Sequence, residues 1–197
     1  MEKKIVQRQV ADKTRMRIIK AAHKLFAEYG FSGTTTKAIA DFAKVNENLI
    51  FHHFKNKAEL WKQVKAEVIH HIPLEPLDVE PQSLAIFLKS IITQRISLYQ
   101  QRPDLVRLLQ WQRLESKSDQ LAADHILAPK NWIAPILHLQ KTHKIQAETH
   151  AEIIVIWLLT SINAAVFDNI AFLKREKNRQ DYIDCLLVGF ERALAAA

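Results

Sequence analysis

The chain has 197 residues, 48% of them hydrophobic, so it is long and apolar enough to bury a core. It contains only 3 glycines and 6 prolines, which argues against a β-rich fold with many tight turns. The formal net charge is +7, and residues 1–66 hold 14 Lys or Arg against 6 Asp or Glu, whereas the remainder is nearly neutral. A basic segment joined to a neutral one indicates a polyanionic partner at one end of the chain.

The first third of the chain has the spacing of several short helices. Ile18, Ala22 and Phe26 share one face of a first helix, and Gly30 is a suitable C-cap for it. A turn over residues 32–36 is rich in N-cap residues and precedes a second helix, which ends near residues 44–46. We interpret Phe42, together with Ile50 and Phe54 of the next helix, as core residues rather than as base-stacking aromatics.

Helical spacing continues through the rest of the chain. Asn56 and Glu59 resemble a capping box that opens a fourth helix running to Ile72, and a proline-containing linker follows over residues 73–81. Further helices are predicted near 84–98, from Pro103, and over 129–143, 148–175 and 178–196, with residues 116–130 polar and irregular. The stretch 153–173 is long enough to span a bilayer, but its central polar groups predict a buried soluble helix and no membrane contact.

Three short helices and a fourth within about sixty basic residues are typical of a helix-turn-helix. In that motif the second helix crosses the DNA backbone and the third enters the major groove, where residues at its start reach base edges. The sequence therefore predicts a DNA-binding head at the N-terminus.

Residues 14–64 resemble the TetR family of transcriptional regulators along the whole of this segment. The resemblance rests on Leu25–Phe31, Thr34–Thr36, Ile50–Phe54 and Asn56–Lys57, without gaps. It implies an all-α fold of about nine helices: a helix-turn-helix head over residues 1–55, which begins with a basic arm (1–12, with Lys3, Lys4 and Arg8), and a helical bundle over 56–197. It further implies a homodimer that binds a pseudo-palindromic DNA operator, most often as a repressor released by a small, largely apolar ligand.

The resemblance also implies roles for individual residues of the head. A hydroxyl of Thr35 or Thr36 would meet phosphate, Lys37 a base or phosphate, and Lys57 a phosphate, while Asn46 would cap the recognition helix. Residues facing the groove or the DNA backbone would be Glu47, Asn48, Leu49, Phe51, His52 and His53.

Four residues depart from the usual family pattern. Lys44 occupies a turn position that is often glycine, so this turn either is strained or takes another form. Glu47 replaces a common basic residue and could accept from a cytosine amino group, whereas Leu49 replaces a threonine and could meet a thymine methyl group. Phe51 replaces a tyrosine and loses a hydroxyl contact. These changes reduce the expected number of phosphate contacts.

The C-terminal bundle offers candidate residues for two further sites. An apolar pocket with a few polar anchors could be built from Arg95, Arg107, Trp111, Trp132, Asn163 and Phe167. The last two predicted helices are apolar enough to pair with their copies in a four-helix interface, with Trp157, Ile183, Leu186, Leu187, Phe190 and Leu194 as the expected contacts.

No motif for catalysis, a cofactor or a metal is found, so no enzyme activity is expected. The adjacent His52 and His53 would point about 100° apart on a helix, which makes chelation by this pair poor. The single cysteine, Cys185, permits no internal disulfide, and the N-terminus lacks the apolar segment of a secretory signal, so a bacterial cytoplasmic, nucleoid-associated protein is expected. Two alternatives stay open: a ligand-binding or interaction protein whose head has weak or lost operator binding, and an enzyme or transporter built around the apolar helix.

Overall fold

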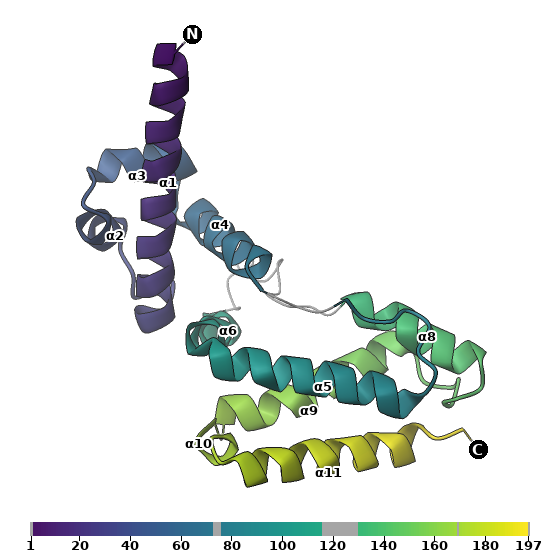
Figure 1. The fold of residues 1–197 in the computed structure, drawn as a ribbon. Helices are drawn as coiled ribbons and strands as arrows, with labels where there is room; N and C mark the ends of the chain where they lie inside the picture. The colour runs from purple at the N-terminus through teal and green to yellow at the C-terminus, as the bar shows by residue number, and fades with distance from the viewer. Residues whose placement is uncertain (1, 73–75, 116–129, 169, 197) are drawn as a thin grey trace. The chain divides into compact units, whose positions relative to one another are not determined.

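The computed structural model describes residues 2–72, 76–115, 130–168 and 170–196. Within these ranges the regular structure consists of ten α-helices and one 3-10 helix, which confirms the predicted all-α class (Figure 1). By packing, the chain forms two compact units, Met1–Ile72 with Pro103–Leu127 and Pro73–Arg102 with Ala128–Ala197. This packing places the fourth and sixth helices with the N-terminal segment, beyond the predicted head boundary at residue 55.

The first unit is built around one long helix. α1 (Glu2–Tyr29) contacts α2 (Thr36–Ala43), α4 (Lys57–His70) and α6 (Pro103–Glu115). α3 (Glu47–Phe54), which lies between α2 and α4 in the sequence, packs against both. The predicted arm over 1–12 is therefore the start of α1, and the side chains of Lys3, Lys4 and Arg8 lie outside the described part of the structure. The buried core of the unit includes Ile18, Ala22, Phe26, Ile39, Ile50, Phe54, Leu60, Trp61 and Val64.

Gly30 ends α1 as the sequence predicts. Its φ of +74° is a left-handed conformation, and its amide donates to the Phe26 carbonyl at 3.0 Å. A Cβ atom at this position would lie 2.7 Å from the ring of Trp111, which no real contact tolerates. Backbone conformation and the close approach of α6 therefore both require glycine here.

The core assignment of the second and third helices is correct at two positions and wrong at one. Ile50 and Phe54 are buried, but Phe42 is 50% exposed. The ammonium of Lys24 lies 5.0 Å from the centroid of the Phe42 ring, so this aromatic ring carries a surface cation–π contact instead of filling the core. Ile39, Ala40 and Ala43 are the residues of α2 that face inwards.

The second unit consists of α5 (Leu84–Gln101), the 3-10 helix η1 (Lys130–Trp132), α8 (Ile133–Lys141), α9 (Ala151–Asp168), α10 (Ile170–Leu173) and α11 (Glu176–Leu194). α5 packs against α9 and α11, and α8 packs against α9. The helix predicted over 148–175 corresponds to α9 and α10, and residue 169 between them lies outside the described part of the chain. The irregular segment predicted over 116–130 lies almost entirely outside the described residues. Among the helices that the structure describes, none has the length and apolar character needed to cross a bilayer.

Lys44, at the turn between α2 and α3, has the conformation that usually belongs to glycine. Its φ and ψ are 53° and 51°, and its amide donates to the Asp41 carbonyl at 3.2 Å. A residue with a Cβ atom is strained in this left-handed region by about 1 kcal/mol. Of the two forms that the sequence left open, the turn therefore takes the strained one, with a left-handed residue that carries a Cβ atom.

We expect Lys44→Gly to raise the free energy of unfolding by about 0.5–1 kcal/mol, because it removes the Cβ strain. Chemical denaturation of both proteins measures the difference. Lys44→Ala is the matched control, since it removes the same charge but keeps the Cβ atom, and it should give no gain. Equal effects of the two substitutions would show that the charge, not the backbone, sets the stability of this turn.

Candidate nucleic-acid interface

The outward face of α3 is the candidate surface for recognition. Ile50 and Phe54 anchor the helix in the core, which turns Asn48, Leu49, Phe51 and His52 to the surface. Leu49 is 38% exposed and Phe51 45% exposed, so the face combines two apolar groups with polar ones. The face thus presents groups suited to hydrogen bonds and to apolar contacts with base edges.

Both helices of the motif begin with a side-chain cap. Thr35 caps α2, its hydroxyl oxygen accepting from the Ala38 amide at 3.1 Å. Asn46 caps α3, its side-chain oxygen accepting from the Asn48 amide at 2.9 Å, as the sequence predicts. The Thr35 hydroxyl is exposed and still has a proton to donate. Capping thus fixes where each helix starts and leaves a donor at the start of α2.

Glu47 does not project freely from the recognition helix. The hydroxyl of Thr36 donates to its Oε1 at 2.6 Å, which joins the first turn of α2 to the first turn of α3. Both side chains are half-buried. This bond restrains the carboxylate that would otherwise repel phosphates, and it sets the spacing between the two helices.

Lys57 occupies a different place from the one implied by the family resemblance. Its ammonium donates to the carbonyl oxygens of Phe31 and Thr34, both at 2.9 Å, and lies 4.4 Å from the Phe31 ring centroid. Burial lowers the pKa of Lys57, while the carboxylate of Glu115 acts in the opposite direction. The lysine therefore ties the loop between α1 and α2 (residues 30–35, the α1–α2 loop) to α4, rather than reaching outwards as a dedicated phosphate contact.

The same loop is held from α6. The amides of Phe31 and Ser32 donate to the two carboxylate oxygens of Glu115 at 3.0 and 2.9 Å. The Thr34 hydroxyl donates within the loop region to the Gly30 carbonyl at 2.7 Å. The α1–α2 loop is thus held by the ammonium of Lys57 from α4 and by the carboxylate of Glu115 from α6. A movement of the loop at the start of α2 would break these hydrogen bonds.

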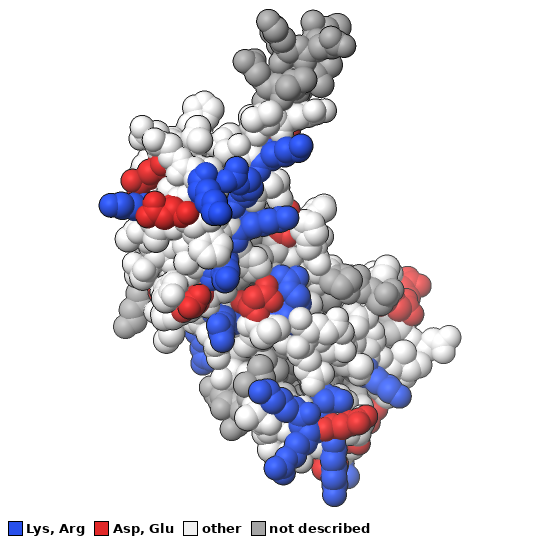
Figure 2. Space-filling view, turned by 60° about the vertical axis from the view of Figure 1, so that its left-hand side comes forward, with Lys and Arg blue, Asp and Glu red and all other residues white. Residues whose placement is uncertain are grey.

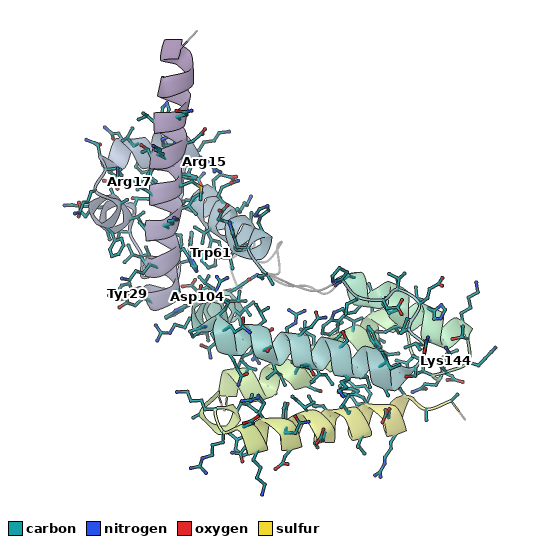
Figure 3. The ribbon with its side chains drawn as sticks, viewed as in Figure 1. Arg15, Arg17, Tyr29, Trp61, Asp104 and Lys144 are labelled. Atoms are coloured by element: carbon teal, nitrogen blue, oxygen red, sulfur yellow. The ribbon has the colours of Figure 1, made fainter. Side chains whose placement is uncertain are left out.

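Two arginines of α1, which sequence reasoning missed, complete the head. Arg17 donates through Nη2 to the carbonyls of Ala43 and Lys44, at 2.6 and 3.2 Å, and so holds the end of α2. Arg15 points to the other side of α1, where Nη2 donates to Gln63 of α4 at 2.6 Å (Figure 3). Their spacing of two residues, about 200° around a helix, is the only sequence signal for these opposite directions.

Basic side chains surround this face. Lys37, Lys44 and Lys55 are exposed on or next to α2 and α3. In Figure 2, Lys and Arg side chains gather over the first unit, below the N-terminus, with fewer acidic groups beside them. A ridge on α1 shares one helical face and consists of Lys13, Arg17, Lys20 and Lys24. The positive charge counted in the sequence is therefore displayed on the surface of the unit that carries α3.

The two histidines of α3 differ in their surroundings. His52 is exposed, whereas His53 is half-buried, and their rings meet edge to face with centroids 5.2 Å apart. Burial lowers the pKa of His53, and the neighbouring His52 and Arg15 lower it further, against a smaller opposite effect of Asp12. Among the described residues no group of three potential metal ligands gathers here or elsewhere.

The six predicted pocket residues divide between the two units. Arg107 and Trp111 belong to α6 of the first unit, where Trp111 packs against Gly30 and Arg107 lines a groove of about 390 Å³ with residues of α1. Helical periodicity alone does not tell which partner a helix packs on, and the assignment of these two residues to a ligand pocket stays a prediction. The other four lie in the second unit, around Tyr99 of α5, a residue that the sequence did not single out.

The residues predicted to form the dimer interface differ in their exposure. Ile183, Phe190 and Leu194 are buried inside their own unit, Leu186 and Leu187 are half-buried, and Trp157 is 45% exposed with its ring 4.6 Å from that of Phe190. The exposed apolar residues are instead Ile153, Ile156 and Trp157 on α9 and Val188 on α11. Of the residues predicted on α11, Ile183, Phe190 and Leu194 therefore face the core of their own unit, and the dimer interface itself stays a prediction.

Comparisons with known proteins agree with this geometry. Residues 18–64 match the model of the family described as bacterial regulatory proteins, tetR family. The chain is 30% identical over 106 residues to the HTH-type transcriptional repressor SCO4008 of Streptomyces coelicolor, covering 52% of this chain and 50% of that protein. It is 39% identical over 67 residues to the HTH-type transcriptional repressor NicS of Pseudomonas putida, covering 34% of this chain and 30% of that protein. The chain thus matches half the length or less of these relatives.

Solved structures share the fold over nearly the whole chain. Salmonella enterica GusR superposes with a TM-score of 0.72 at 23% identity, covering 92% of this chain and 95% of that one. The transcriptional regulator FadR from Bacillus subtilis, in complex with stearoyl-CoA, superposes with a TM-score of 0.68 at 19% identity, covering 88% and 98%. These likenesses extend the family fold beyond the N-terminal segment that the sequence matches.

We expect Lys57→Met to lower the free energy of unfolding by about 1–2 kcal/mol, because it leaves two loop carbonyls without a charged donor. For a chain of this size the melting temperature should fall by roughly 3–6 °C in thermal denaturation. Lys62→Met on the same helix is the control: its ammonium makes only an exposed contact of 3.8 Å with Glu59 and should change stability little. Equal stability of the two variants would contradict the role given to Lys57.

Proposed function

Because the chain belongs to the TetR family of bacterial regulatory proteins, we propose that it is a transcriptional regulator that binds duplex DNA with the outward face of α3. The observation that carries the proposal is the exposed row Asn48, Leu49, Phe51 and His52, held on a rigid and basic unit. An α-helix of this kind fits the major groove. The protein would act in the bacterial cytoplasm, where its operators lie.

The contacts with DNA separate into those that position and those that specify. Lys37, Lys44 and the Thr35 hydroxyl are placed to meet phosphates, a contact that raises affinity for every sequence. Asn48 and Leu49 are placed to meet base edges, the first by hydrogen bonds and the second by contact with a thymine methyl group. Glu47, bonded to Thr36, supports the geometry more than it reads a base.

A homodimer is the second part of the proposal, formed through the exposed apolar face of α9 and α11. Ile153, Ile156 and Trp157 share one side of α9, and Val188 with Gly189 lies on the outer side of α11. Gly189 has open space around its missing Cβ, although glycine within a helix costs about 1 kcal/mol relative to alanine. A glycine on an exposed face allows a partner helix to approach the backbone closely.

Two-fold symmetry then determines the operator. A dimer of helix-turn-helix heads binds two half-sites about one helical turn apart, roughly 34–36 Å, on a pseudo-palindrome. Repression relieved by a small molecule is the mode of regulation that we propose, with the second unit as the sensor. The ligand must bind one state of the dimer better than the DNA-bound state, since equal affinity shifts nothing.

α6 offers a route by which the sensor reaches the head. It follows α5 of the second unit after one residue, Arg102, and its last residue, Glu115, holds the α1–α2 loop. A shift of α6 on ligand binding would loosen two charge-assisted hydrogen bonds at the loop that precedes α2. The position of α3 relative to its copy would then no longer match the operator.

Selection from a random duplex library at moderate salt should recover an inverted repeat with half-sites one turn apart. Lys37→Ala should weaken binding to all sequences alike and reduce the dependence of log K on log salt by about 2, one phosphate from each subunit. Asn48→Ala should change the preferred base instead. Lys141→Ala, in α8 of the second unit, is the control with unchanged binding.

A library that yields no motif, with the dimer intact, would contradict operator binding. It would favour the alternative of a ligand-binding or interaction protein whose head has lost this activity, for which the apolar Leu49 and Phe51 are the structural reason.

We expect Gly189→Arg to convert the dimer to a monomer in analytical ultracentrifugation while the helical content is retained, because arginine is a good helix former but blocks close approach. Gly189→Ala is the control, since it improves helix propensity by nearly the same amount and adds only one methyl group. A dimer that persists in Gly189→Arg would place the interface elsewhere.

A further inference from the structure

Arg95 is a buried charge in the middle of α5. Its relative exposure is 4%, and its Nη1 atom, screened from solvent, has no hydrogen-bond partner. A guanidinium stays protonated in proteins, so the charge itself is buried. This is a costly arrangement unless something supplies the missing acceptor.

In the described part of the chain, Arg95 contacts the aromatic residues Trp132 and Tyr99. The guanidinium carbon lies 5.1 Å from the centroid of the Trp132 ring, and the group donates a hydrogen bond to the Tyr99 hydroxyl. Burial raises the pKa of Tyr99, and the charge and hydrogen bond of Arg95 oppose that rise. Tyr99 in turn donates to Oδ1 of Asn163 at 2.7 Å, and its ring centroid lies 6.4 Å from that of Phe167.

These contacts form one connected cluster, Trp132–Arg95–Tyr99–Asn163 with Phe167, drawn from η1, α5 and α9 of the second unit. The same two helices, α5 and α9, also carry buried aliphatic side chains close in sequence to the cluster, including Ile91, Ile92, Ile96, Leu158 and Ile162. No carboxylate of the described residues forms an ion pair with Arg95. Among the side chains that the structure describes, the cluster therefore consists of aromatic rings, neutral hydrogen-bonding groups and a single cation that no carboxylate pairs.

We propose that Arg95 binds the carboxylate of an organic acid, whose apolar body packs against Trp132 and the aliphatic side chains of the bundle. The inference rests on the proposed function, in which the second unit is the sensor, and it identifies the chemical class of the effector. A planar carboxylate matches the donor geometry of a guanidinium edge. One cation also balances a monoanionic carboxylate, whereas a phosphate dianion would require further positive groups.

The test measures the melting temperature of the full chain with octanoate, dodecanoate and phenylacetate, each against its neutral alcohol, with octylamine and sodium acetate as further controls. Wild-type protein should melt about 3 °C higher at carboxylate concentrations tenfold above the dissociation constant. The alcohols, the amine and acetate should have no such effect. Three carboxylates without any shift, or alcohols as effective as the acids, would overturn the proposal.

Two variants identify the residue. Arg95→Met should lose the carboxylate response and, without ligand, melt above the wild type, because it removes an uncompensated buried charge. Lys89→Met, on the exposed side of the same helix, is the matched control and should respond as wild type does. Arg95→Lys keeps the charge without the planar fork and should bind about tenfold more weakly. An Arg95→Met variant that still responds, or that is strongly destabilised without ligand, would show that the chain already supplies the counter-ion.

The outcome separates this inference from the proposed function. A recovered operator motif without carboxylate binding overturns only the class of effector. Carboxylate binding that depends on Arg95, in a protein that selects no DNA motif, upholds the site and overturns only DNA recognition.

Discussion

The arrangement of helices in the first unit depends on the hydrogen bonds that hold the α1–α2 loop. Backbone groups of Phe31, Ser32 and Thr34 receive their partners from Lys57 and Glu115, side chains far away in sequence. Because the loop would otherwise leave amides and carbonyls unsatisfied beside a packed core, these bonds decide where α2 begins. Arg17 then decides where α2 ends, and Thr36 with Glu47 decides where α3 begins relative to it. The recognition surface is thus positioned by charges that do not themselves read DNA.

The two units use charge in opposite ways. In the first unit the charged groups of Arg17, Glu47, Lys57 and Glu115 all have hydrogen-bond partners. In the second unit the described partners of the Arg95 guanidinium are an aromatic face and a tyrosine hydroxyl. Satisfied networks confer rigidity, whereas a buried and incompletely satisfied charge stores free energy that a binding partner can release. Rigidity suits a surface that must match a fixed groove, and stored free energy suits a site that must respond to a ligand.

Local features were predictable from the sequence, and long-range ones were not. Caps at Asn46 and Asn56 and the glycine end of α1 follow from residues within a few positions, so the sequence located them correctly. The place of α6 could not be read in this way, because its apolar stripe packs against α1 across some eighty residues. For the same reason the sequence did not indicate that Arg107 and Trp111 pack in the first unit, and local spacing placed Phe42 in the core although it lies on the exposed face of α2. Lys57 matched a family motif, but its partners are backbone carbonyls, which leave no trace in a sequence pattern.

The coupling free energy that the proposed regulation needs can be compared with the free energy of the hydrogen bonds that would transmit it. Allosteric coupling free energies are typically 1–3 kcal/mol, and a hydrogen bond to a charged group contributes about 1.5–3 kcal/mol. In the regulation that we propose, the two bonds from Glu115 to the α1–α2 loop have the free energy that such a coupling requires. α6 follows α5 after one residue, Arg102. The helix that holds Arg95 is therefore joined to Glu115, which holds the loop, through Arg102 and the length of α6. In that proposal, a carboxylate bound at Arg95 would act by favouring one position of α5 over another, and the covalent continuation into α6 would pass the difference to the α1–α2 loop.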